Sequence, residues 1–167
     1  MARSDSFVST ATNETVTTMT LGPDPRAGML APIVPTVTTQ TPGGRTMVVT
    51  SGRVTTRADS TDPLSLTSQI DSVSVNGQWT VTSYTAATRH FVATSAEGRQ
   101  RFATLDAKGR ITATQTAGLD SAQFSYDNLG RLSQQQVGGR VLSYSYDTRG
   151  RTWDALTGTQ GRRIGSP

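Results

Sequence analysis

The sequence predicts an all-β fold in which consecutive antiparallel β-hairpins form an open, curved sheet. Three observations predict it. Thr and Ser number 29 and 17 among the 167 residues, and Thr, like the other β-branched residues, favours strands. No window places apolar residues at the spacing of an amphipathic helix. Turn signals recur along the chain, from Glu97 onward at intervals of about ten residues, which is the length of one strand and one turn.

The upstream part, residues 1–94, is predicted to contain degenerate β-hairpins. Four segments in it alternate or are β-branched throughout, and we expect strands there: Val34–Gln40, Thr46–Ser51, Ser72–Val75 and Gln78–Tyr84. Turns are expected at Pro42-Gly43-Gly44, Ser51-Gly52, Asp62-Pro63 and Asn76-Gly77. Residues 21–35 hold four of the seven prolines. Because proline cannot donate to a sheet ladder, we expect a proline-rich connection or an irregular edge there.

The downstream part, residues 95–152, contains an internal repeat. Its pattern is a large apolar or aromatic residue followed by D-x-x-G-R. Three copies carry it, Leu105–Arg110, Tyr126–Arg131 and Tyr146–Arg151, and a degenerate copy precedes them at Ser95–Arg99. The arginines of the three copies are 21 and 20 positions apart, which indicates one hairpin per copy. Residues 153–167 show no strand pattern, and we expect a frayed tail.

Turn chemistry explains the repeat. Asp at the first position of a type I turn accepts hydrogen bonds from the turn's own amides, and Gly at the fourth takes the left-handed conformation. The register then places Tyr126 opposite Leu132, and Leu105 opposite Ile111. We assign this structural turn role to nine residues: Asp106, Gly109, Arg110, Asp127, Gly130, Arg131, Asp147, Gly150 and Arg151.

Aromatic side chains are predicted to line one face of these hairpins. By alternation, Phe124 and Tyr126 share a face with Leu132, and Tyr144 and Tyr146 share a face with each other. The opposite face is expected to be hydroxyl-rich, with Ser125, Ser133, Gln135, Ser143 and Ser145. We expect the aromatic face to be a cross-strand ladder, with sugar stacking as the competing role.

The Tyr-Asp-x-x-Gly-Arg units at Tyr126–Arg131 and Tyr146–Arg151 resemble the YD repeat of Rhs proteins, teneurins and the shell components of bacterial toxin complexes. The resemblance implies hairpins that wind into a β-sheet spiral, which in bacterial members encloses a toxin. On this resemblance, we expect 167 residues to be far too few to close such a shell, and we expect neither the self-cleavage region nor the C-terminal toxin domain within them.

The function implied by the resemblance is a non-catalytic wall segment of a shell that encapsulates or escorts a polymorphic toxin in bacterial competition. Its partners would be neighbouring YD/Rhs repeats or the toxin cargo. The resemblance also implies a secreted or cell-surface location, although Met1–Val16 lacks the apolar stretch of a signal peptide. The alternative is a cell-surface module that binds carbohydrate on its tyrosine and serine face.

Composition argues against the other classes. The chain has no Cys and a single His, His90, so we expect no thiolate nucleophile, no His relay, no metal site and no cofactor. No apolar run is long enough to span a bilayer. Residues 1–88 hold five basic and six acidic residues, and residues 89–167 hold eleven and six. Five of the downstream arginines follow a turn glycine and are therefore spread along the sheet, which argues against a nucleic-acid surface.

Overall fold

The structure of the protein, a computed structural model, describes residues 5–158 and 162–163. All the secondary-structure elements in these residues are β-strands. The strands divide between two compact units, which are described separately. The first unit comprises residues 1–88 and 92–99, and the second comprises residues 89–91 and 100–167. The division passes through β7 (His90–Thr94).

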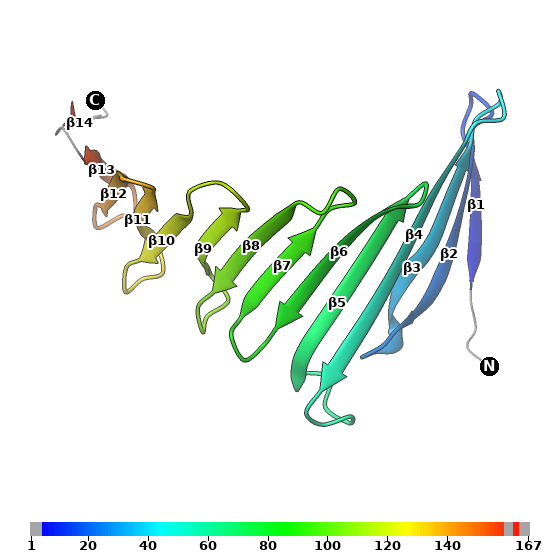
Figure 1. Cartoon of the computed structure of the whole chain (residues 1–167), viewed down its shortest axis with the longest axis horizontal. Helices are drawn as coiled ribbons and strands as arrows, with labels where there is room; N and C mark the ends of the chain where they lie inside the picture. The colour runs from blue at the N-terminus through cyan, green and yellow to red at the C-terminus, as the bar shows by residue number, and fades with distance from the viewer. Residues whose placement is uncertain (1–4, 159–161, 164–167) are drawn as a thin grey trace. The chain divides into compact units, whose positions relative to one another are not determined.

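The first unit is an antiparallel sheet whose strands follow one another in chain order (Figure 1). Its strands before β7 are β1 (Ser6–Thr10), β2 (Val16–Asp24), β3 (Gly28–Gln40), β4 (Thr46–Arg57), β5 (Leu66–Val75) and β6 (Gln78–Thr85). Each pairs with the next through a hairpin. The all-β, hairpin-by-hairpin fold expected from the sequence is thus confirmed in this unit.

Register gives the first unit two chemically different faces, because directly opposed residues share a face and neighbours along a strand alternate. One face carries an apolar row that crosses β1 to β5: Phe7, Met19, Val37, Val49 and Val75. The other carries a hydroxyl row across the same strands: Ser6, Thr20, Thr36, Thr50 and Ser74.

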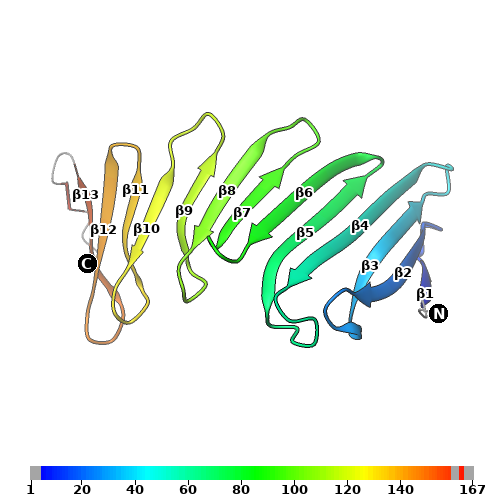
Figure 2. The same ribbon diagram turned by 60° about the horizontal axis from the view of Figure 1, so that its bottom comes forward.

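The second unit is built in the same way (Figure 2). Its strands after β7 are β8 (Gln100–Leu105), β9 (Ile111–Thr116), β10 (Ala122–Tyr126), β11 (Leu132–Val137), β12 (Arg140–Tyr146), β13 (Thr152–Gly158) and β14 (Arg162–Arg163). Consecutive strands again pair antiparallel. The predicted opposition of Tyr126 to Leu132, and of Leu105 to Ile111, is observed.

The four upstream strand predictions are confirmed, since each segment lies within β3, β4, β5 or β6. The turn predicted at Ser51-Gly52 is wrong, because β4 runs straight through it. Gly52 is opposed to Ser72 on β5, and a Cβ added at position 52 would lie 3.1 Å from the Ser72 hydroxyl oxygen. The glycine therefore permits a close cross-strand approach and does not reverse the chain.

The proline-rich segment 21–35 is not a connection outside the sheet. It contributes the ends of β2 and β3, with only residues 25–27 between them. The ladder is irregular there, since the register shifts on either side of Gly22. Irregular pairing tolerates prolines because fewer ladder donors are needed.

The tail expected to fray from residue 153 begins instead with a strand. β13 pairs with β12 from Thr152 to Gly158, and β14 pairs with β13. The preceding turn fixes the register of β13, so backbone pairing proceeds without an alternating side-chain pattern. The rest of the predicted tail, residues 159–161 and 164–167, lies outside the described residues.

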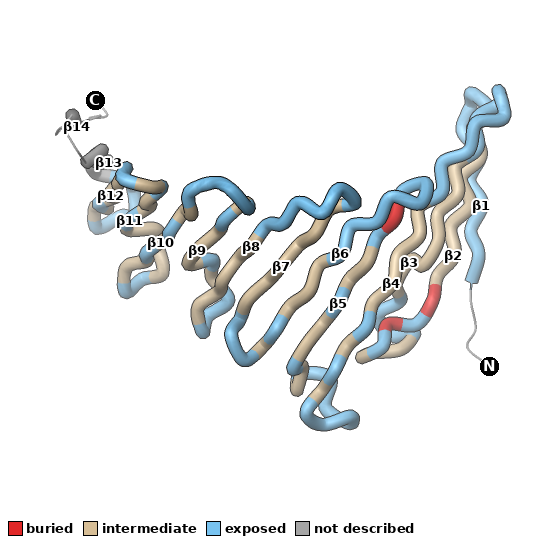
Figure 3. The backbone as a smooth tube through the Cα atoms, viewed as in Figure 1, coloured by how far each residue is buried: buried red, intermediate tan, exposed pale blue. Residues whose placement is uncertain are grey.

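Burial is slight in both units. Among the residues whose burial is described, no hydrophobic side chain is buried, and the buried residues are Gly22, Asp24 and Ser74 (Figure 3). A single-layer sheet leaves both faces accessible, which explains the absence of a conventional core in this part of the chain. Within the described ranges, we find no helix of the length and apolarity needed to cross a bilayer.

Candidate functional site: the repeated turn and its tyrosine

The three repeat copies fold into the same turn. In each, the amide of the Asp donates to the carbonyl of the Arg four residues later, and the amide of the Gly donates back to the Asp carbonyl. For Asp127 these two distances are 2.8 and 3.0 Å. The glycines have φ angles of +78°, +82° and +80° at positions 109, 130 and 150. Only glycine adopts this region at little cost, so the repeat specifies the turn.

The Asp carboxylate closes each turn from within. One oxygen of Asp106 accepts hydrogen bonds from the amides of Lys108 and Arg110, at 2.8 and 3.0 Å. Its other oxygen accepts from Nε of Arg110 at 2.7 Å. Asp127 and Asp147 make the same three contacts. The Arg110 backbone amide, together with its guanidinium, holds the pKa of Asp106 below its usual value despite opposing desolvation. Both oxygens of each carboxylate therefore accept hydrogen bonds that stabilise the turn.

Adjacent repeats are joined through their tyrosines. The Tyr126 ring lies beneath the guanidinium of Arg110, 4.4 Å from the ring centre, and its hydroxyl donates to the Ile111 carbonyl at 2.7 Å. Tyr146 repeats the arrangement with Arg131, at 4.3 Å, and with the Leu132 carbonyl, at 2.7 Å. Each tyrosine therefore holds two consecutive residues of the repeat before it. We call this pair of contacts the tyrosine–arginine interlock.

The turn glycine takes part in one of the interlocks. A Cβ added at Gly130 would lie 3.3 Å from Nη1 of Arg110. That nitrogen is buried and has no hydrogen-bond partner among the described residues. It belongs to the guanidinium that covers the Tyr126 ring, and a ring face attracts a cation electrostatically. Gly130 is thus needed both for its backbone conformation and for the space beside Arg110.

Sequence reasoning missed a further copy of the repeat's turn. A turn was expected at Pro42-Gly43-Gly44, yet the residues from Thr41 to Arg45 have both backbone bonds of the repeat, with Gly44 at φ +79°. The Thr41 hydroxyl accepts from the Arg45 amide at 3.2 Å, in place of a carboxylate. The degenerate copy Ser95–Arg99 has the same backbone bonds. The sequence signal for these copies is a Gly-Arg pair with Thr or Ser four positions before the arginine.

The aromatic residues are only partly placed as alternation suggests. The register shifts between Ser125 and Tyr126, leaving Ser133 as an extra residue. Gln135 is consequently opposed to Phe124 and shares its face, so its assignment to the opposite, hydroxyl-rich face is wrong. Tyr144 is opposed to Ala155. Tyr126 and Tyr146 are interlocked, so a guanidinium group covers one face of each ring.

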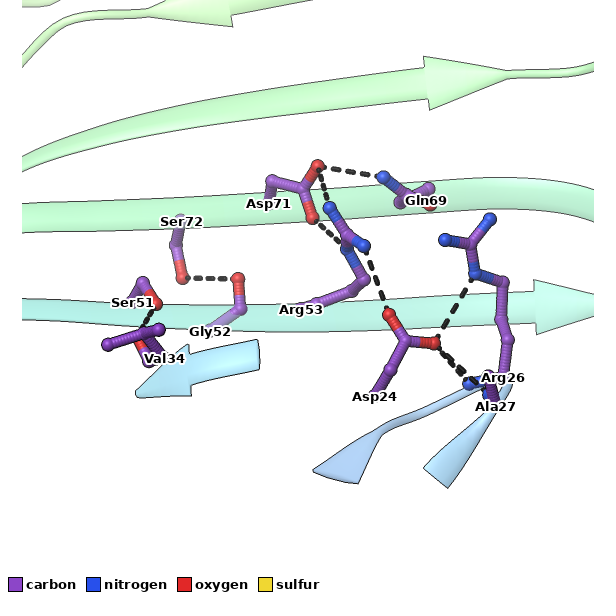
Figure 4. A network of polar contacts seen from close by, with 10 residues as sticks. All are labelled: Asp24, Arg26, Ala27, Val34, Ser51, Gly52, Arg53, Gln69, Asp71 and Ser72. Atoms are coloured by element: carbon purple, nitrogen blue, oxygen red, sulfur yellow. Dashed lines mark hydrogen bonds and ion pairs between the residues drawn. The ribbon is translucent and has the colours of Figure 1, made fainter. Parts of the chain in front are cut away.

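A second polar cluster, which the sequence did not predict, lies in the first unit (Figure 4). Arg53 on β4 donates to Asp24 at 3.0 Å and to Asp71 on β5 at 2.6 Å. Asp24 also accepts from the amides of Arg26 and Ala27, at 2.7 and 3.3 Å. The Pro-Asp-Pro-Arg stretch could have predicted the local turn. The pairing with Arg53 depends on the sheet register and has no sequence signal.

This cluster is the most buried charged site described. The side chain of Asp24 is 3% exposed. Burial acts to raise its pKa, but the Arg26 amide, the Arg53 guanidinium and the Ala27 amide outweigh it and lower the pKa to about 2. Asp24 is therefore an ionised hydrogen-bond acceptor at neutral pH. Asp24 is the last residue of β2, and its bond to Arg53 on β4 ties the irregular end of the β2–β3 hairpin to the sheet.

His90 is placed beside an aromatic ring. It stacks on Phe102 with ring centres 5.9 Å apart and planes 15° from parallel. The two rings line a cavity of about 230 Å³ together with Thr104, Gln115 and Ser121. The residues lining this cavity include no carboxylate to orient the imidazole. Within the described ranges, no group of three or more His, Cys, Asp or Glu residues could hold a metal ion.

Comparison with known proteins identifies the repeat. The family model described as "Teneurin YD-shell" matches residues 4–163. A chain in a structure of the Photorhabdus luminescens Tc holotoxin pore matches 97% of this chain, with 12% identity and a TM-score of 0.43. This chain corresponds to 10% of the length of that one. No curated protein matches significantly.

Proposed function

The chain belongs to the Teneurin YD-shell family, and we propose that it is a wall segment of a shell that encapsulates or escorts a toxin in bacterial competition. Family membership supports a structural shell role. The observation that carries the proposal is the tyrosine–arginine interlock, because it joins successive hairpins through side chains as well as through the backbone ladder. In a wall built from repeats, each hairpin has to be held to the next by contacts of this kind.

Charge placement is consistent with a wall. The repeat carboxylates are each held by amides and by an arginine of their own turn. They are thus unavailable as paired acids and bases, which need two free carboxylates facing one substrate. This supports a non-catalytic role for the repeat region.

The carbohydrate-binding alternative requires aromatic rings whose faces are accessible to a sugar. Tyr126 and Tyr146 each have a guanidinium over the ring and a hydroxyl bonded to a backbone carbonyl. A sugar would have to displace an arginine to stack on the covered face of either ring. We therefore prefer the wall to the carbohydrate module as the function of these residues.

The test starts from the DNA on both sides of the reading frame. We expect it to encode further YD repeats, or a toxin with its immunity protein. Co-expression of the chain with those products should yield a co-purifying complex in which the toxin resists added protease. A chain that purifies alone, beside a toxin that is digested as quickly as in its absence, would contradict the proposal. Binding on a glycan array that is lost with Tyr144→Ala and Tyr146→Ala would favour the alternative.

A further inference from the structure

One turn of the first unit consists of the pair Asn76-Gly77, which connects β5 to β6. Asn76 has a φ of +49° and Gly77 has a φ of +85°. Positive φ at both residues of a two-residue hairpin loop is the signature of a type I′ turn, which asparagine followed by glycine favours. Both residues are exposed, and a Cβ added at Gly77 would meet nothing within 4 Å. Water therefore reaches this turn.

Asn76 also binds the neighbouring strand β4 at two points. Its backbone amide donates to the carbonyl of Val48 at 2.8 Å, and its side-chain oxygen Oδ1 accepts from the Val48 amide, also at 2.8 Å. In a regular antiparallel ladder, the Val48 amide would donate to the backbone carbonyl of residue 76. The side chain thus replaces a backbone group, and it extends the β4–β5 ladder by one pair beyond Val49 and Val75.

The Asn76-Gly77 pair can also react within itself. The backbone nitrogen of Gly77 attacks Cγ of Asn76, which closes a succinimide ring. The side-chain nitrogen of Asn76 leaves as ammonia and takes the Gly77 amide proton with it. Water then opens the ring at either carbonyl and gives aspartate or isoaspartate. Among the described residues, neither the Gly77 amide nor Nδ2 of Asn76 donates a hydrogen bond, so both nitrogens are free to react.

We propose that Asn76 is a site of spontaneous deamidation, and that its bond to the Val48 amide controls the rate. Ring closure requires the carboxamide to turn towards the Gly77 nitrogen, whereas the bond to Val48 holds it against β4. Deamidation therefore waits for the turn to open locally, and openings of this kind occur in folded proteins. This inference concerns the first unit alone and does not depend on the proposed shell function.

The other two asparagines of the chain serve as internal controls. Asn13 is followed by Glu14, and Asn128 is followed by Leu129. The side chains of Glu14 and Leu129 hinder the approach of the backbone nitrogen to the carboxamide, whereas glycine has no side chain to do so. We therefore expect Asn76 to react before either of the other two asparagines.

The test is to incubate the full chain in mildly alkaline buffer and to map its peptides by mass spectrometry, separating aspartyl from isoaspartyl products. Both products should form at position 76, about 10-fold more slowly in the folded chain than in the chain unfolded by guanidinium chloride. Equal rates in the two states would overturn the role of the Val48 bond. Reaction at Asn13 or Asn128 as fast as at Asn76 would overturn the site.

Variants of Val48 test the control of the rate directly. Val48→Pro removes the donor to Oδ1 but no bond to β3, because both polar backbone groups of Val48 bind Asn76. It should accelerate deamidation of the folded chain by about 3- to 10-fold. Val48→Thr keeps the amide and should leave the rate unchanged. An unaltered rate in a folded Val48→Pro chain would contradict the inference; if that variant does not fold, the comparison of folded and unfolded chain decides.

The two products should differ in their effect on stability. Asn76→Asp keeps an oxygen for the Val48 amide, so this variant should fold almost as well as the unsubstituted chain. Isoaspartate adds a methylene group to the backbone of the turn and displaces that oxygen from β4. The equilibrium constant for folding of the isoaspartyl form should fall by about 10-fold in urea titrations. An isoaspartyl form as stable as Asn76→Asp would overturn the role assigned to the Val48 bonds.

Discussion

At the scale of residues, the side chain of the repeat tyrosine makes two different contacts. The tyrosine of each full repeat places its ring under an arginine and donates a hydrogen bond to a carbonyl, and both partners belong to the previous repeat. Such a cation–π contact contributes about 0.5–1 kcal/mol at accessible sites, and a neutral hydrogen bond about 1 kcal/mol. Together, the two contacts contribute about as much free energy of folding as the burial of one or two methyl groups. This contribution is considerable because the described residues provide no buried hydrophobic core.

Two glycines provide a matched test of this packing. Gly150→Ala should cost about 1 kcal/mol of unfolding free energy, because alanine resists a φ of +80° and nothing else lies within 4 Å of the new Cβ. Gly130→Ala should cost about 1 kcal/mol more, since the methyl group also pushes Arg110 from the Tyr126 ring. Urea unfolding measures both. Equal losses of unfolding free energy for the two variants would mean that Arg110 moves aside at no cost, and that its packing against Gly130 does not stabilise the fold.

The Asp24 cluster predicts a pH dependence. Its pKa of about 2 lies below the ordinary value of 3.8, so the ionised carboxylate stabilises the folded state above about pH 4, and this contribution is lost as the pH falls through 2. Asp24→Asn should therefore lower the free energy of unfolding by about 2 kcal/mol at pH 7. The difference from the unsubstituted chain should shrink below pH 4 and close near pH 2.

The control for Asp24 is Asp62→Asn. Asp62 is exposed, and its side chain accepts one described hydrogen bond, from the Leu64 amide, which an asparagine oxygen can also accept. Denaturant titrations at several pH values should show little change for this variant. A pH-independent loss for Asp24→Asn would indicate that the charge of Asp24 is immaterial to the cluster.

Sequence reasoning succeeded at this scale where the chemistry is local. The contacts of Asp127 within its own turn follow from residues four positions apart. The interlock of Tyr146 with Arg131 spans 15 residues and needs the intervening hairpin to return at the right register. Pairing between Asp24 and Arg53 needs two hairpins. Neither has a pattern that a single sequence displays.

At the scale of elements, one hairpin has the repeat's turn but carries glutamate at the position where the repeat has glycine. The turn from Ala11 to Thr15 has the repeat's backbone bonds, yet Glu14 occupies the glycine position at φ +63°. Glu14→Gly should stabilise the folded state by about 0.5–1 kcal/mol by relieving the left-handed conformation. Glu14→Ala removes the same carboxylate without relieving the backbone, so it should give no gain. Thermal unfolding of both variants distinguishes backbone strain from charge.

Elements were predictable where turn signals and alternation agree. The hairpins from Ser95 to Thr152 satisfy both, and their strands follow, whereas the register shift that moves Gln135 to the face of Phe124 does not. Ser51-Gly52 carries a turn signal inside a β-branched segment, and the ladder prevails because its partner strand on β5 is long and continuous. β13 lacks alternation but is set by the turn at Asp147–Arg151. The context that decides these cases is the neighbouring strand.

At the scale of the whole molecule, the missing feature is a second layer. The apolar row of the first unit ends in Phe7, 50% exposed, and Val75, 44% exposed. A sheet normally packs such a face against another layer. The described residues provide none, and so the chain by itself should be only marginally stable.

This gives a prediction for the purified chain. It should bind a hydrophobic dye such as ANS, or associate at micromolar concentration, while circular dichroism reports β-structure. Phe7→Thr with Val75→Thr should reduce the dye signal, and Thr20→Ser with Thr50→Ser, on the hydroxyl row, should not. A monomeric chain that unfolds sharply and cooperatively and binds no dye would mean that the apolar row is covered after all.

The interlock between repeats is tested most directly by a double-mutant cycle on Arg131 and Tyr146, measured by urea unfolding with Arg131→Ala, Tyr146→Leu and the double variant. We predict a coupling free energy of about 0.5–1.5 kcal/mol. The same cycle between Arg131 and Tyr144 should show no coupling beyond about 0.5 kcal/mol. Losses for Arg131 and Tyr146 that simply add would contradict a wall whose hairpins are joined through their side chains.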